Sequence, residues 1–133
     1  MSDVDEREWY FGSGATCHMS RCAEGFVKQQ QMSHPVGTAN NGCMMSVAKG
    51  VMNLQLEEGP IEVKNVLQIP ELATNLLSVS KICEKGLSVV FSADQCEVRG
   101  NNGNVIASGT QIGGLYRLNR KAEQLMLTFC SEV

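Results

Sequence analysis

Short apolar runs separated by strong turn signals dominate this sequence, and they restrict the chain to a mainly β fold. Four turn signals stand out: Gly12-Ser13-Gly14, Asn40-Asn41-Gly42, Glu57-Glu58-Gly59-Pro60 and Asn101-Asn102-Gly103-Asn104. Asn and Gly suit such turns because both tolerate the left-handed backbone region. The runs between the turns are a few residues long and contain many β-branched and aliphatic residues, which is typical of strands.

Only one segment has a helical period. Its apolar residues recur at three- and four-residue steps: Leu76, Leu77, Val79, Ile82 and Cys83. We expect Thr74 or Asn75 to cap the start of this helix and Gly86 to end it. Residues 21–35 have no clear period and are expected to form a loop with at most one helical turn. The sequence therefore predicts a mostly β domain with one short helix, arranged as a small closed β-barrel.

The length and composition of the chain fit a single folded domain. The chain has 133 residues, of which 43% are hydrophobic and 19% are charged, so a core can form without metal or disulfides. Six cysteines are spread irregularly and no signal sequence precedes them. Free thiols are therefore expected rather than a disulfide framework, which is typical of secreted chains.

Charge and hydropathy narrow the set of partners. The formal net charge is -3 and no run of Lys or Arg is present, so nucleic acid is not expected as a partner. No apolar stretch reaches the ~20 residues that cross a bilayer, so no membrane partner is expected either. The acidic N-terminal residues carry no apolar signal core, which favours a cytoplasmic location.

One apolar run leads into a sequence that resembles part of a catalytic loop. Peptide hydrolysis by carboxylates needs two Asp side chains that share one proton, one acting as base toward water and the other as acid. The usual carrier is Asp-Ser/Thr-Gly directly after an apolar strand. Trp9-Tyr10-Phe11, followed by Gly12-Ser13-Gly14-Ala15, supplies every part of this pattern except the Asp.

Three stretches carry a family resemblance. Residues 9–20, WYFGSGATCHMS, resemble the signature of copia-type retrotransposon proteases, close to W-hydrophobic-hydrophobic-D-S-G-A-[ST]-x-H-M. Residues 65–86, NVLQIPELATNLLSVSKICEKG, resemble the NVLYVP-x-L-x-x-NLLSV block of the same family. Val89–Phe91 and Gly114–Leu118 match its V-x-F and G-L-Y-x-L ending.

The resemblance implies a retropepsin-like closed barrel with a flap hairpin, working as a twofold-symmetric homodimer in which each copy lends one signature loop. A second copy of the chain and a Gag-Pol polyprotein peptide are the implied partners, without a cofactor, in the cytoplasm or within virus-like particles. The protease domain would span residues 8–118, after a flexible tail at 1–7 and before an extension toward integrase at 119–133. The implied flap tip, which would contact substrate, consists of Asn40, Asn41, Gly42, Cys43, Met44 and Met45.

Gly12 departs from the family pattern. It stands where the family has its catalytic Asp, while Ser13, Gly14 and Ala15 complete the loop. None of the three aspartates, Asp3, Asp5 and Asp94, precedes a hydroxyl residue and a glycine. We therefore expect an aspartic endopeptidase domain that is inactive as written. Gly12 is either a deliberate change that prevents self-digestion or a natural loss, as in a domesticated, non-catalytic dimerisation or peptide-binding module.

Several other residues have two interpretations. Cys17, His18 and Cys22 could belong to a metal site, but the spacing is not a zinc pattern, and no metal is expected. Cys17 or Cys22 with His18 or His34 could form a nucleophile and base, although neighbouring strand residues point to opposite faces. Met44 and Met45 could line a substrate groove or simply fill the core.

Overall fold

The computed structural model describes residues 7–37 and 42–121. Its elements are, in chain order, β1 (Trp9–Gly12), β2 (His18–Ser20), β3 (Phe26–Gly37), β4 (Cys43–Leu56), β5 (Gly59–Gln68), β6 (Asn75–Ser78), α1 (Val79–Glu84), β7 (Ser88–Phe91), β8 (Gln95–Arg99), β9 (Val105–Ile112) and β10 (Leu115–Leu118). The prediction of a mostly β domain with one short helix is therefore confirmed. The described part holds no helix long and apolar enough to cross a membrane.

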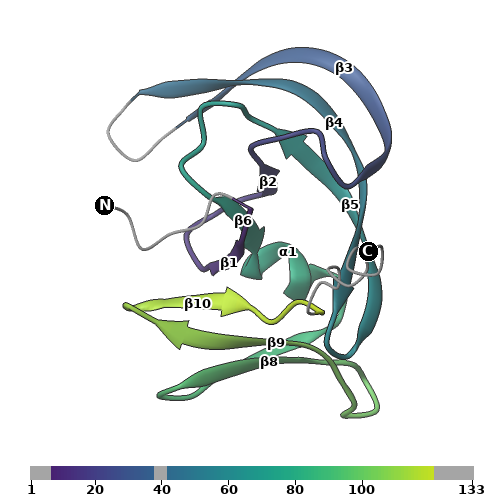
Figure 1. Cartoon of the computed structure of the whole chain (residues 1–133), viewed down its shortest axis with the longest axis vertical. Helices are drawn as coiled ribbons and strands as arrows, with labels where there is room; N and C mark the ends of the chain where they lie inside the picture. Colours follow the sequence, from purple (N-terminus) through teal and green to yellow (C-terminus); the bar gives the residue numbers. More distant parts are fainter. Residues whose placement is uncertain (1–6, 38–41, 122–133) are drawn as a thin grey trace, which may run out of the picture.

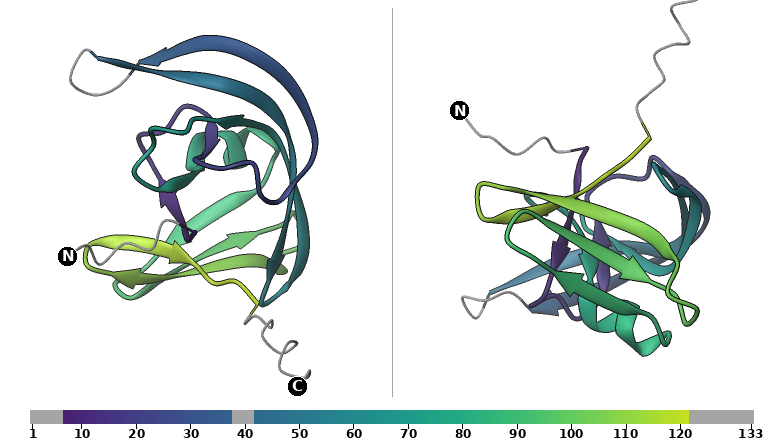
Figure 2. Two further views of the ribbon diagram at one scale, coloured as in Figure 1. Left: turned by 45° about the horizontal axis from the view of Figure 1, so that its top comes forward. Right: turned by 90° about the horizontal axis from the view of Figure 1, so that it is seen from below.

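The ten strands form one sheet in the order β3-β4-β5-β2-β6-β1-β10-β9-β8-β7. Two pairs are parallel, β1 with β6 and β2 with β5, and the other pairs are antiparallel. Figure 1 shows the long β3–β4 hairpin arching over β1, β2 and β6, with β8, β9 and β10 on the opposite side. The same arrangement is visible in the left view of Figure 2.

The expected closed barrel is not confirmed, because the sheet formed by the described residues is not closed. The ladder ends at β3 and at β7, which do not pair with each other. Among the described strands β3 pairs with β4 alone, and this is why Pro35, which cannot donate to a ladder, is tolerated there. Partial closure occurs elsewhere: Leu56 forms an isolated bridge with Arg120, and the Lys121 amide donates to the Gln55 carbonyl at 2.8 Å.

Two local predictions also need correction. The segment predicted as one helix from Leu76 begins as strand β6, and α1 starts only at Val79 with Ser78 as its N-cap. The cause is the parallel pairing of β6 with β1, which extends the backbone through Ser78. Most of residues 21–35, expected to be loop, belong to β3.

The core lies between β1, the middle of β4 and β5, and the β8–β9 layer. Its members are apolar and buried: Trp9, Phe11, Met52, Leu54, Leu56, Val63, Val66, Leu77, Cys96, Val98, Ala107 and Leu118. Inward and outward residues alternate along the second half of β4, which gives this strand one core face. Asn75 is buried too, and its side-chain amide donates to the Glu8 carbonyl at 3.0 Å while its oxygen accepts from the Arg21 amide at 2.8 Å.

Candidate functional site

The turn that follows β1 is the centre of the candidate site. β1 pairs in parallel with β6, so that Phe11 lies opposite Leu77 and Gly12 opposite Ser78. After Gly12 the chain reverses, and the Ala15 amide donates to the Gly12 carbonyl at 3.4 Å. Gly12 therefore stands at the end of a buried strand, where the backbone leaves the sheet in a tight turn.

Ser78 holds this turn against the start of the helix. Its hydroxyl donates to the Ala15 carbonyl at 2.7 Å and accepts from the Lys81 amide at 3.2 Å, which makes it the N-cap of α1. The Ser80 hydroxyl lies 3.0 Å away. Because Ser78 is fully buried, the loss of these bonds would leave polar groups unsatisfied.

His18 supports Ser78 from β2. Its Nδ1 atom accepts a hydrogen bond from the Ser78 amide at 2.9 Å, so this nitrogen carries no proton in the folded state. Burial, and secondarily the charges of Lys81 and Lys85, lower the pKa of His18 to about 4. His18 is therefore a neutral structural acceptor at neutral pH.

The backbone at Gly12 has room for a side chain. A Cβ atom at this position would lie 3.3 Å from the Ala15 Cβ and 3.5 Å from the Leu76 Cδ2. Gly12 is not among the residues with positive φ, so its conformation is open to any L-residue. A shift of a few tenths of an ångström at Ala15 would accommodate the new atom.

The segment predicted as the flap tip adjoins a long hairpin of β3 and β4. Gly37 pairs with Cys43, so Cys43, Met44 and Met45 belong to β4 and not to the tip. Gly42 directly precedes β4, and Asn40 and Asn41 lie outside the described residues. Met45 is 41% exposed and Met44 is half-buried, so neither fills the core as the alternative interpretation of these methionines required.

The cysteine alternatives find no support in the geometry. Burial raises the pKa of the Cys17 thiol, the opposite of what an activated nucleophile needs. The Nδ1 atom of His18 is already occupied by the Ser78 amide. No cluster of three or more potential metal ligands occurs within residues 7–37 and 42–121. The five cysteines in these ranges are all free thiols.

The sequence matches the family model described as "Pol polyprotein, beta-barrel domain" over residues 9–87. The chain belongs to this family. The matched Pol polyprotein β-barrel region contains the Gly12–Ala15 turn, the β3–β4 hairpin, Ser78 and α1.

A curated relative places this Pol domain among retrotransposon proteins. The chain is 25% identical over 134 residues to the "Retrovirus-related Pol polyprotein from transposon RE1" of Arabidopsis thaliana. The alignment covers 98% of this chain but 9% of the relative. The chain is thus a domain related to a retrotransposon Pol polyprotein and spans a small part of the length of the protein it matches.

Sequence reasoning missed the role of Ser78 in this Pol domain. The expected helix cap was Thr74 or Asn75. A usable signal was present, because Ser78 directly precedes the residues that become helical. The predicted roles of Gly12, Ser13, Gly14 and Ala15 in catalysis stay predictions.

Proposed function

We propose that this chain is the aspartic endopeptidase domain of a copia-type retrotransposon polyprotein, and that Gly12 occupies the position of the catalytic Asp. The active form would process Gag-Pol peptides in the cytoplasm or within virus-like particles. The single observation that carries the proposal is the turn after β1: it leaves a buried strand, has room for a side chain at position 12 and is braced by Ser78.

Peptide hydrolysis needs two carboxyl groups, and the Gly12–Ala15 turn of this chain carries none. Water attack on a peptide carbonyl uses one ionised and one protonated carboxyl in close proximity. Glycine supplies neither group. Asp94 lies before β8, where its carbonyl accepts from the Gln111 amide, and Asp3 and Asp5 lie outside the described residues. The proposal therefore includes loss of hydrolysis in the present sequence.

The proposed active unit is a homodimer. Each chain contributes one Gly12–Ala15 turn, and a pair of catalytic carboxyls requires two turns that face each other across a twofold axis. The β3–β4 hairpin of each copy would cover the substrate peptide. Its exposed side chains, including Met45, are suited to adaptable apolar contacts.

The alternative is a domesticated, non-catalytic dimerisation or peptide-binding module with glycine as the native residue. The favouring observation is that the outer edge of β3 has no described strand partner, so it could pair with an extended peptide. The codon for residue 12 in the source element separates the two cases. An aspartate codon there would exclude the module in its simple form.

The decisive experiment compares Gly12→Asp with Gly12→Asn. Both add a side chain of the same shape, but only Asp supplies a carboxyl group. We expect the folded Gly12→Asp dimer to cleave a Gag-Pol fragment in a pepstatin-sensitive manner, whereas Gly12→Asn and the present chain do not. A folded, dimeric Gly12→Asp protein without such cleavage would overturn the proposal, and sedimentation velocity would verify the dimer independently.

A further inference from the structure

A small apolar cavity lies between β5, α1 and the β8–β9 layer. Its volume is about 280 Å³, and we call it the seam cavity. Four of its aliphatic side chains are only partly buried: Ile61, Ile82, Leu87 and Ile106. Figure 1 shows the elements concerned, with α1 beside β5 and above β8 and β9.

The strand edges beside the seam cavity have no partner among the described strands. β2 joins β5 only from Val66 onward, so residues 59–65 of β5 have no described strand on the side away from β4. Residues 105–107 of β9 likewise pair only with β8, since the β10 ladder stops at Gly109. A hydrogen bond from the Ser108 hydroxyl to the Glu58 carboxylate ties β9 to the start of β5. Free backbone donors and acceptors therefore border the seam.

Lysines surround the open side of the seam. A second cavity of about 450 Å³ shares His18, Lys64, Lys81 and Lys85 with the seam cavity and adds Lys49. We call Lys49, Lys64, Lys81 and Lys85 the lysine rim. These residues come from β4, β5, α1 and the C-cap of α1, so only the fold brings them together. The positive charges of Lys81 and Lys85 contribute to the low pKa of His18, which shows that their field reaches the cavity wall.

The lysine rim keeps excess positive charge despite two neighbouring carboxylates. Lys64 lies 3.9 Å from Glu62 and Lys81 lies 3.4 Å from Glu84, and all four side chains are largely exposed, so these pairs are weak. Neither Lys49 nor Lys85 forms an ion pair within the part of the chain that the structure describes. This local excess contrasts with the net charge of -3 for the whole chain.

We propose that the seam cavity and the lysine rim form a docking site for an extended acidic peptide that inserts one large apolar side chain. The inserted side chain contacts Ile61, Ile82 and Ile106, the flanking carboxylates meet the lysines, and the peptide backbone pairs with the free edge of β5. Gly12, Ser13 and Gly14 do not line this site, whereas Phe11 and His18, which flank the turn, do.

The dimensions and the lining favour a peptide over other anionic partners. A volume of about 280 Å³ falls just below the range of about 300–1,000 Å³ typical of pockets that enclose whole drug-sized ligands, but it accommodates one side chain. Single-stranded nucleic acid stacks its bases on exposed aromatic rings. The aromatic residue of the seam cavity is Phe11, which is 7% exposed.

Fluorescence anisotropy with the full chain and labelled peptides tests the site. The probe is acetyl-EDELEDE-amide, and the comparison peptides replace the central leucine by serine or methylate its backbone nitrogen. We expect the serine peptide to bind at least tenfold more weakly, because it loses the apolar contact. Methylation should weaken binding similarly, since it removes a strand hydrogen bond. Equal binding of all three peptides would overturn the proposal.

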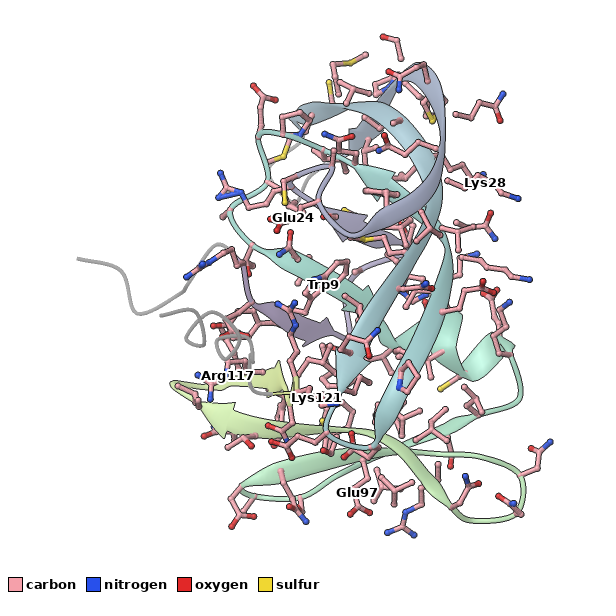
Figure 3. The ribbon with its side chains drawn as sticks, turned by 45° about the vertical axis from the view of Figure 1, so that its right-hand side comes forward. Trp9, Glu24, Lys28, Glu97, Arg117 and Lys121 are labelled. Atoms are coloured by element: carbon pink, nitrogen blue, oxygen red, sulfur yellow. The ribbon has the colours of Figure 1, made fainter. Side chains whose placement is uncertain are left out.

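Matched protein variants separate the site from general charge effects. Lys85→Gln removes a rim charge. Lys121→Gln removes an exposed charge that lines neither cavity; Lys121 is labelled in Figure 3, and its amide donates to the Gln55 carbonyl. We expect about threefold weaker peptide binding for Lys85→Gln, the scale of one partly exposed charge pair, and no change for Lys121→Gln. Equal losses of peptide binding in the two variants would overturn the proposal. Tighter binding of oligouridine than of the peptide, weakened by Lys85→Gln, would overturn it as well. Unchanged thermal unfolding verifies that both variants fold.

Discussion

The hydroxyl of Ser78 donates a 2.7 Å hydrogen bond to the Ala15 carbonyl across 63 positions of the chain. The same oxygen accepts from the Lys81 amide, so one buried atom joins the turn after β1 to the first turn of α1. The geometry of the candidate site therefore depends on a residue that lies outside the signature stretch.

Replacement of Ser78 by alanine should destabilise the fold and loosen the turn. We expect a loss of about 2–3 kcal/mol in the free energy of unfolding, because a buried hydrogen bond and a helix cap disappear together. Ser88→Ala, at an exposed position on β7, is the control and should cost less than about 0.5 kcal/mol. Urea unfolding measures both values, and similar losses for the two variants would contradict the assigned role of Ser78.

Acid should weaken the fold through His18. Its pKa is about 4 in the folded chain against about 6.5 when unfolded, so the folded state binds fewer protons between these values. The His18 contribution is complete above about pH 6.5 and is lost as the pH falls toward 4. We expect a loss on the order of 2 kcal/mol over this interval.

The His18 contribution can be isolated by comparing variants. Urea unfolding at pH 7 and pH 5 should give a smaller difference for His18→Gln than for the unmodified chain. His34→Gln, at an exposed position on β3, should retain the full difference. An NMR titration that gave His18 an imidazole pKa near 6.5 in the folded protein would contradict the structural interpretation.

Replacement by alanine should destabilise the protein at one glycine and have little effect at another. A Cβ atom at Gly109 would lie 2.8 Å from the Cys96 Sγ and the Phe11 Cε2, so we expect Gly109→Ala to cost about 1–3 kcal/mol. Gly12→Ala should change stability by less than about 1 kcal/mol, because its φ is unrestricted and a small shift at Ala15 relieves the 3.3 Å contact with the new Cβ. Thermal unfolding compares the two variants, and a larger cost at Gly12 would argue against a side chain at that position.

Cysteine reactivity should follow burial. Cys96 is fully buried, and burial raises the pKa of its thiol to about 11, so we expect it to resist alkylation at pH 8 until the protein unfolds. Cys43 is exposed and should react in the native state. Peptide mapping by mass spectrometry, with and without urea, identifies the modified positions. Rapid native labelling of Cys96 would show that the β8–β9 layer opens easily.

The sequence predicted the parts of the fold that depend on local signals. The apolar run at Trp9–Phe11 and its interruption at Gly12 correspond to β1 and the following turn. The Asn101–Asn104 signal lies between β8 and β9, which pair as expected. These features were predictable because turn residues and short apolar runs act within a few positions of the chain.

Long-range pairing accounts for what the sequence did not reveal. Leu76 and Leu77 have helical spacing, but a parallel neighbour distant in sequence extends them into β6, and no local pattern signals that neighbour. β3 was missed because, as an edge strand with one partner, it needs few apolar residues. The same parallel pairing keeps the chain extended through Ser78, so Ser78 becomes the helix cap.

The long-range contacts of the candidate site also determine when the turn after β1 can form. β1 pairs with β6 and β10, and the Ala15 carbonyl accepts its hydrogen bond from the hydroxyl of Ser78, 63 residues later in the chain. During synthesis the first strand therefore leaves the ribosome long before its neighbours exist, and such non-local contacts form slowly. The turn consequently cannot take its final shape until β6, α1 and β10 have all been translated.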